Sequence, residues 1–254
     1  PRVVNKDPGG EERAAGFAAL NEGRLGDAES LFRRALNQRL GDSDSQGGLG
    51  IVRLRQQRFA EAERLLAQAM RGPAPSRWKE AFDSARFFDR FVKARDALSA
   101  GKLAEAEQLA RPLTNEDFKD KTEAQLLLGE VYTRQQRYRE AQAVYQEAYL
   151  RAPERPEAIA GLADSLSQLG RSEEALKLLD KLPRTASAKE ARSRIERSRA
   201  ADLQRRGDDY GAGAALAASL AANPANPWAR YEFAKFLTAR GQIQQANEVA
   251  APLF

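Results

Sequence analysis

Small and large apolar residues alternate with polar ones at helical spacing along this chain, and the pattern repeats. Each block centres on an alanine within a segment similar to Glu-Ala-x-x-Leu. These key alanines are Ala28, Ala62, Ala106, Ala141, Ala175, Ala212 and Ala246. The intervals between them are 34, 44, 35, 34, 37 and 34 residues. A block that recurs in this way predicts one supersecondary unit that the chain uses several times.

Three further positions keep the same phase. Twelve residues before each key alanine lies a small residue, where two helices would meet closely: Gly16, Gly50, Ala94, Gly129, Ala163, Ala200 and Ala234. Five residues before it, the expected turn carries Gly23, Gly101, Gly170, Gly207 and Gly241, with Gln57 and Gln136 as exceptions. Glycine tolerates the left-handed backbone that ends a helix. Four residues after it comes a larger apolar residue in Phe32, Leu66, Tyr145, Leu179 and Leu216.

A period of 34 residues with these positions is that of the tetratricopeptide repeat, a helix-turn-helix unit. We therefore predict an all-α fold, a right-handed superhelical solenoid of about six to seven such repeats. Residues 1–76 would hold repeats 1 and 2, residues 102–187 repeats 3 to 5, and residues 188–254 repeats 6 and 7, the last truncated. No polar capping element follows Leu253, so we expect the array to continue beyond it.

The interval of 44 residues predicts an extra or extended helix after repeat 2, at residues 77–101. Its apolar side chains are expected to pack against the neighbouring repeats. The alternative is a hinge, because stacking must change where the period breaks; the candidate hinge residues are Arg77, Trp78, Phe82 and Phe87. The three additional residues near Pro183–Glu190 predict a longer loop.

The first helix of a repeat of this type lines the concave surface, so its outward positions are candidates for binding a partner or ligand. Repeat 6 has Arg194, Arg197 and Arg205 there, and repeat 7 has Trp228, Tyr231 and Lys235. A basic strip beside aromatic rings could hold an acidic peptide or a sugar polymer. The alternatives are a solvated helix face, since Glu196 and Asp202 alternate with the arginines, and packing of both aromatics against the preceding repeat.

Composition removes most catalytic chemistry. The chain has no cysteine and no histidine, which excludes disulfides, Cys or His metal sites, and catalysis by thiolate or imidazole. We find no catalytic constellation, predict no enzymatic activity and expect no cofactor or metal. A net charge of +5 over 254 residues is far from the concentrated charge of a nucleic-acid-binding protein. The Lys-Asn pair with which some chaperone-associated repeats bind a C-terminal carboxylate is also missing.

Beyond the repeat itself, the order of features resembles one family. The segments DSDSQGGLGIVRLRQQRFAEAERLLAQA, TEAQLLLGEVYTRQQRYREAQAVYQEA and NPANPWARYEFAKFLTARGQIQQA are similar to the periplasmic repeat region of the outer-membrane cellulose export protein of bacterial cellulose synthase complexes. The insertion SRWKEAFDSARFF, the helix ARSRIERSRAADLQRRGD and the Pro-Trp-x-x-Tyr start of repeat 7 are the more particular features. One departure is the Phe-Phe pair in the insertion, where an aromatic-Trp pair is expected.

The resemblance implies a non-enzymatic scaffold in the periplasm, the repeat region of an outer-membrane protein. Its partners would be other protein subunits of a cellulose synthase complex, with the glucan chain as a further candidate ligand and no nucleic acid. Attachment to the membrane would use parts outside this sequence. Two alternatives stay open: an adaptor of another exopolysaccharide or pilus assembly system, and a module that binds glucan directly.

Overall fold

The computed structural model describes residues 7–115 and 121–253. Within these ranges the chain forms fourteen α-helices, a short 3₁₀-helix at Ala251–Leu253 and no strand. The first helices are α1 (Gly10–Asn21), α2 (Leu25–Gln38), α3 (Ser43–Arg55), α4 (Phe59–Ala69), α5 (Ser76–Ser99), α6 (Leu103–Asn115) and α7 (Lys121–Arg134). The others are α8 (Tyr138–Arg151), α9 (Pro156–Gln168), α10 (Ser172–Leu179), α11 (Ala186–Arg205), α12 (Asp209–Ala222), α13 (Pro227–Ala239) and α14 (Ile243–Ala250).

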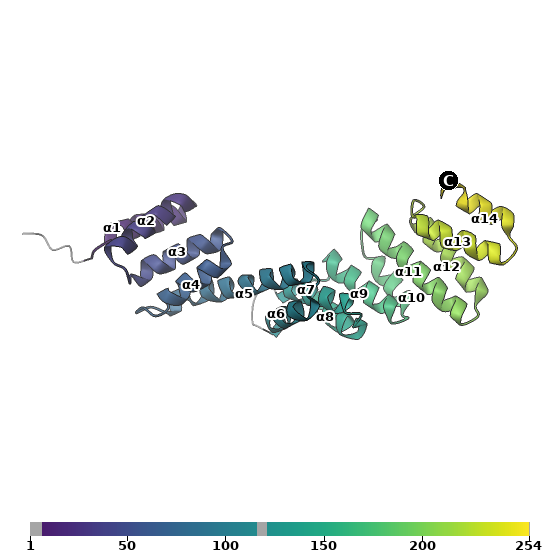
Figure 1. Cartoon of the computed structure of the whole chain (residues 1–254), viewed down its shortest axis with the longest axis horizontal. Coiled ribbons are helices and arrows are strands. Elements are labelled where there is room, and N and C mark those ends of the chain that lie inside the picture. The colour runs from purple at the N-terminus through teal and green to yellow at the C-terminus, as the bar shows by residue number, and fades with distance from the viewer. Residues whose placement is uncertain (1–6, 116–120, 254) are drawn as a thin grey trace, which may run out of the picture. The chain divides into compact units, whose positions relative to one another are not determined.

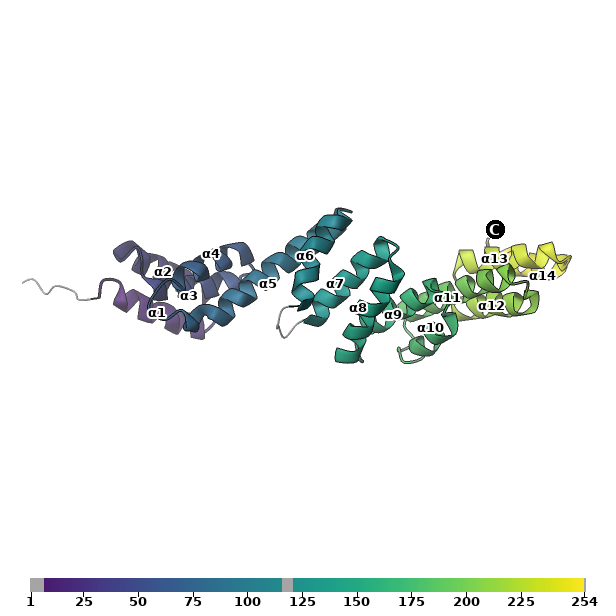
Figure 2. The ribbon, with the colours of Figure 1, turned by 90° about the horizontal axis from the view of Figure 1, so that it is seen from below.

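The helices pack as consecutive hairpins (Figures 1 and 2). The pairs are α1 with α2, α3 with α4, α7 with α8, α9 with α10, α11 with α12, and α13 with α14. Within α1 to α4 and within α7 to α14, neighbouring hairpins contact each other, for example through α2 and α3, or α8 and α9. The chain divides into two compact units, Pro1–Asp96 and Ala97–Phe254. The predicted all-α fold of tandem helix-turn-helix repeats is confirmed.

Every predicted turn position has the left-handed backbone. The glycines at these positions, Gly23, Gly101, Gly170, Gly207 and Gly241, have φ between 72° and 77°. Gln57 and Gln136 take the same conformation, with φ of 59° and 60°. The left-handed conformation therefore belongs to the repeat, and two turns adopt it without glycine.

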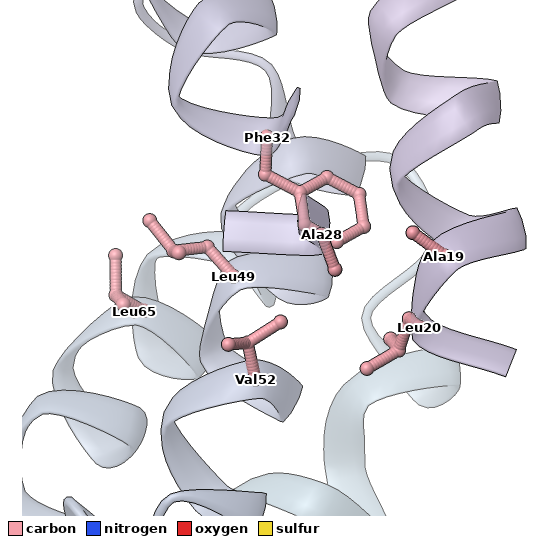
Figure 3. Packing of buried hydrophobic residues seen from close by; sticks show 7 residues of the cluster. All are labelled: Ala19, Leu20, Ala28, Phe32, Leu49, Val52 and Leu65. Atoms are coloured by element: carbon pink, nitrogen blue, oxygen red, sulfur yellow. The ribbon is translucent and has the colours of Figure 1, made fainter. Parts of the chain in front are cut away.

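The small residues leave room for large ones on the neighbouring helices. The positions that define the repeat are all buried: Gly16, Ala28, Gly50, Ala62, Ala106, Gly129, Ala141, Ala175, Ala212 and Ala246. Phe32 of α2 shows why. A Cβ atom on Gly16 would lie 2.8 Å from Cε1 of its ring, and one on Gly48 would also overlap the ring. Figure 3 shows Phe32 together with the apolar side chains of α1, α3 and α4 that complete this core.

Each of the two repeats whose turns lack glycine is joined to the preceding repeat through a carboxylate. In the first unit, Glu29 of α2 accepts hydrogen bonds from Nη1 and Nη2 of the buried Arg53 at 2.6 and 2.8 Å. In the second unit, Glu107 of α6 accepts from Gln135 at 3.0 Å and from Arg137 at 2.8 Å. Each carboxylate thus lies on the second helix of one repeat and binds the next repeat. Glu29 binds near the end of the first helix of that repeat, and Glu107 binds the turn that follows this helix.

The long break in the period is a single helix. α5 runs without interruption from Ser76 to Ser99, as the extended helix predicted after repeat 2. The smaller break has a different form. The residues between α10 and α11 end at Thr185, whose hydroxyl accepts from the Ala188 amide at 3.2 Å. The connection at 180–185 is longer than those between α2 and α3 or between α8 and α9, as predicted. It does not extend to Glu190, because this cap starts α11 at Ala186 and lengthens the helix as well.

Candidate functional site

The candidate binding residues of repeats 6 and 7 lie on α11 and α13, whose register is fixed by a buried asparagine. The Asn226 side chain accepts from the amides of Trp228 and Ala229 at 2.9 and 3.2 Å, which starts α13. Its amide group donates to Glu190 of α11 at 3.0 Å. One residue therefore caps α13 and ties its first turn to α11. The side chains that face each other further along the two helices are positioned by this link.

Between α11 and α13 lies a hollow of about 530 Å³. We call it the α11–α13 hollow. It is lined by Arg194, Arg197, Ser198, Ala200, Ala201, Gln204, Leu216, Glu232, Lys235, Phe236, Ala239 and Arg240. Four of these residues are basic and one is acidic, so the lining carries an excess of positive charge.

Each arginine of the hollow is held by a carboxylate from another helix. Arg194 donates from Nη2 to both carboxylate oxygens of Asp164 on α9, at 2.7 and 2.6 Å. Arg197 donates from Nη1 to Glu232 on α13 at 3.2 Å. Arg240 pairs with Asp209 of α12.

Two donors in this lining are less well satisfied. The Nε atom of Arg197 is buried and has no hydrogen-bond partner among the described residues. The Lys235 side chain is exposed and makes no hydrogen bond or ion pair within the same described ranges. Buried donors in folded proteins almost always have an acceptor, so an unpaired one indicates a place where an acceptor is missing.

The sequence-predicted residues do not all meet at one place. Arg194, Arg197 and Lys235 line the α11–α13 hollow, whereas Arg205 pairs with Asp202 and lines a separate hollow beside Gly170. Tyr231 shares with Lys235 a second, more apolar hollow of about 500 Å³ between α13 and α14.

The two aromatic candidates are exposed. The Trp228 side chain is 63% exposed and that of Tyr231 52% exposed. Their rings lie 6.5 Å apart at 89° to each other. The alternative that both rings pack against the preceding repeat was therefore wrong. An edge-to-face pair also offers no continuous flat surface.

The interpretation of α11 as a plain solvated face is also wrong at one position. Glu196 is only 7% exposed. Burial raises the pKa of this carboxyl, against the opposing influence of Arg199. The sequence interpretation missed the burial of this residue, and it did not identify Glu232, Phe236 and Arg240 of the hollow. Glu232 and Phe236 are spaced by four residues on α13, as one helix face requires, and that spacing could have found them.

The candidate hinge residues lie in the first unit and pack there. Trp78 is 2% exposed and Phe87 is 1% exposed. The Arg77 guanidinium lies 4.6 Å from the Trp78 ring and donates to Asp44 at 3.0 Å. Phe82 packs against the cluster that contains Trp78. The division between the two compact units falls later on α5, between Asp96 and Ala97, and the hinge stays a prediction.

Known proteins match this chain in two ways. Models of the tetratricopeptide repeat match residues 13–77, 91–138 and 132–201. Residues 78–90, within α5, lie outside these ranges. A solved structure named "MamA RS-1 ArsTM double mutant" has a TM-score of 0.51 and 14% identity, over 65% of this chain and 90% of that one. At that identity it supports the fold alone.

Two curated relatives extend over nearly all of the sequence. The chain is 35% identical over 236 residues, 91% of its length, to "Cellulose synthase operon protein C" of Pseudomonas fluorescens (strain SBW25). It is 34% identical over 96% of its length to the protein of the same name of Xanthomonas axonopodis pv. citri (strain 306). It spans only 18% and 16% of these two proteins. The resemblance inferred from the sequence motifs is confirmed.

None of the helices in the described residues combines the length and the apolar character that crossing a membrane requires.

Proposed function

This chain belongs to the tetratricopeptide-repeat family, and on that premise we propose that it is a non-enzymatic periplasmic scaffold of a bacterial cellulose synthesis and export complex. In this role it binds other protein subunits of the complex and holds them near the outer-membrane export pore. The observation that carries the proposal is the similarity to cellulose synthase operon protein C over 91% of the chain. Because the chain spans less than a fifth of those relatives, the role of the whole protein is part of the proposal.

The architecture supports a binding role over a catalytic one. Stacked hairpins form extended surfaces whose side chains can vary without disturbing the buried small residues of the repeat. The carboxylates of Glu29 and Glu107 are bound to arginine and glutamine side chains of the next repeat. Their role is therefore to join repeats.

Cross-linking in the cell tests this proposal. A photo-reactive amino acid replaces Tyr231, which is 52% exposed on α13, and in a second strain it replaces the buried Ala110 of α6 as a control. We expect the Tyr231 position to capture subunits of the cellulose synthase complex and the Ala110 position to capture none. Capture of proteins from a different exopolysaccharide or pilus system would support the adaptor alternative instead.

The glucan-binding alternative has a separate test. Cello-oligosaccharides are titrated against the chain and against Trp228→Ala and Tyr231→Ala variants. Binding that is lost in these two variants would favour a module that contacts the polymer directly. Absence of binding in the unmodified chain would exclude it.

A further inference from the structure

We propose that the α11–α13 hollow binds an acidic, extended peptide segment of a partner protein through the side chains of Arg194, Arg197, Lys235 and Arg240. The inference rests on the proposed scaffold function and adds to it the chemistry that the partner must present. Its occupant is a run of aspartate or glutamate side chains.

The charge of the lining favours carboxylates. Four cationic side chains face the hollow and Glu232 is its one acidic lining residue. Lys235 has no ion-pair partner among the described residues, and an exposed ammonium group can bind an incoming carboxylate at little cost. A cation-lined recess also raises the local concentration of acidic segments and accelerates their association.

The carboxylates that now hold the arginines can be exchanged for those of a ligand. The side chains of Asp164, Glu232 and Asp209 are 34%, 40% and 65% exposed. Ion pairs this accessible contribute little net stability, because water screens them. A carboxylate of a partner could therefore replace one of them without a large loss of stability in the fold.

The geometry at Arg197 favours a ligand carboxylate over Glu232. Its guanidinium makes one hydrogen bond of 3.2 Å to Glu232, and its buried Nε atom has no acceptor among the described residues. A carboxylate that binds side-on accepts from Nε and Nη together, which is the preferred geometry of an arginine–carboxylate pair. A rotation of the guanidinium that turns Nε toward the hollow would thus let a ligand carboxylate satisfy the donor that Glu232 leaves unpaired.

The same lining disfavours a neutral sugar polymer. The Phe236 ring is only 7% exposed, and the Arg240 guanidinium lies over it, 3.7 Å from the ring centroid. The exposed aromatics, Trp228 and Tyr231, lie outside this hollow and stand edge to face. Neither arrangement provides the open ring surface on which sugars stack.

Fluorescence anisotropy with labelled octaglutamate, and with octaserine as the neutral control, tests the inference on the full chain. We expect octaglutamate to bind and octaserine not to bind. Lys235→Gln and Arg197→Lys should each weaken octaglutamate binding about fivefold or more, the second because lysine keeps the charge but loses the two-pronged donor. Lys102→Gln, an exposed lysine of the α5–α6 turn that pairs with Glu105, should leave the affinity unchanged within about twofold.

Three results would overturn the inference: no octaglutamate binding, an equal loss in the Lys102→Gln control, or displacement of octaglutamate by cellohexaose. Lys235 is exposed, so its variant tests the hollow even if Arg197→Lys disturbs the fold. The cross-linking experiment fails or succeeds separately. Capture of synthase subunits without octaglutamate binding would keep the scaffold function and reject the acidic ligand.

Discussion

Gln57 and Gln136 occupy a backbone conformation that residues with a side chain avoid. At φ near 60°, a β-carbon crowds the backbone and costs about 1–2 kcal/mol, whereas glycine has no such cost but loses about 0.5–1 kcal/mol more chain entropy on folding. Both glutamines are exposed. We expect Gln57→Gly and Gln136→Gly each to stabilise the protein by about 0.5–1 kcal/mol, measured as a higher urea midpoint.

The reverse substitution provides the control for this expectation. At Gly101, φ is 74° and an added Cβ would meet nothing within 4 Å. Gly101→Ala should therefore destabilise the chain through the backbone alone, by about 1 kcal/mol. If both glutamine variants were less stable than the parent, the backbone would not be strained at these turns.

Glu29 links stability to pH. Hydrogen bonds from Arg53, supported by Gln56, lower the pKa of Glu29 from 4.5 to about 2. The pKa of Glu29 is lower in the folded protein than in the unfolded chain. The contribution of this carboxylate to the free energy of unfolding is therefore complete above pH 5 and is lost as the pH falls from about 5 to 2. Its size is at most about 2–3 kcal/mol, since the 19% exposed side chain is partly screened.

Denaturant unfolding at several pH values measures this contribution. Between pH 5 and pH 2 the parent should lose about 2–3 kcal/mol more stability than Glu29→Gln does. Arg53→Leu should flatten the pH dependence in the same way, because it removes the donor that lowers the pKa. An unchanged pH dependence in both variants would contradict the assignment to this pair.

Three neighbouring helices meet at one ring in the second unit. Tyr145 of α8 lies between Gly129 of α7 and Gly161 of α9. A Cβ atom on Gly129 would lie 2.7 Å from the Tyr145 ring, and one on Gly161 would overlap it further. Burial raises the pKa of the Tyr145 hydroxyl to about 12, so the ring is an enclosed part of the packing.

Gly161→Ala should consequently destabilise the protein although alanine favours helix formation. Overpacking lowers the free energy of unfolding by about 1–3 kcal/mol, and the higher helix propensity of alanine raises it by about 1 kcal/mol. We therefore expect a net loss of stability of about 1 kcal/mol. In a Tyr145→Leu background the same change should become neutral or stabilising. A double-mutant cycle of urea unfolding experiments measures this coupling.

Gly26→Ala on α2 controls for helix propensity, because an added Cβ there meets nothing within 4 Å. It should be neutral or slightly stabilising. Equal losses at Gly26 and Gly161 would show that close packing is not the cause.

The spacing of small and apolar residues predicts these helices well, because the residues that a helix buries recur at fixed intervals. The positions of Ala106 and Gly129 follow from spacing alone, and so does the extended helix at α5. The longer loop before α11 is present, but its end was mispredicted because a single N-cap, Thr185, decides where α11 starts, and several residues nearby could have served as the N-cap. Local hydrogen bonds of this kind leave little trace in a hydrophobic pattern.

The candidate site was predictable only in part. Arg194, Arg197 and Lys235 occupy repeat positions that face outward, so their place on α11 and α13 followed from the period. Arg240 could not be found in that way, because it lies in the turn beyond α13 and reaches the hollow by lying over Phe236. The burial of Glu196 also depends on tertiary packing that its charged neighbours in the sequence do not indicate.

Contacts between neighbouring hairpins set how far a local change can propagate. In an array of this kind, stability is close to a sum of repeat energies and nearest-neighbour interfaces. Phe32 belongs to the core of the first unit and Phe236 to a core of the second. Removing either ring leaves a cavity that costs about 3–5 kcal/mol, and that loss should stay within its own unit.

Hydrogen exchange followed by mass spectrometry resolves where the loss occurs. With Phe32→Ala we expect faster exchange in α1 to α4 and parental rates in α9 to α14. With Phe236→Ala the faster exchange should appear in α11 to α14, while α1 to α4 keep parental rates. The paired variants control for each other because both remove a buried phenylalanine. Uniformly faster exchange in both units from either variant would mean that the chain unfolds as one cooperative body, since a nearest-neighbour array confines the effect to the repeats that touch the cavity.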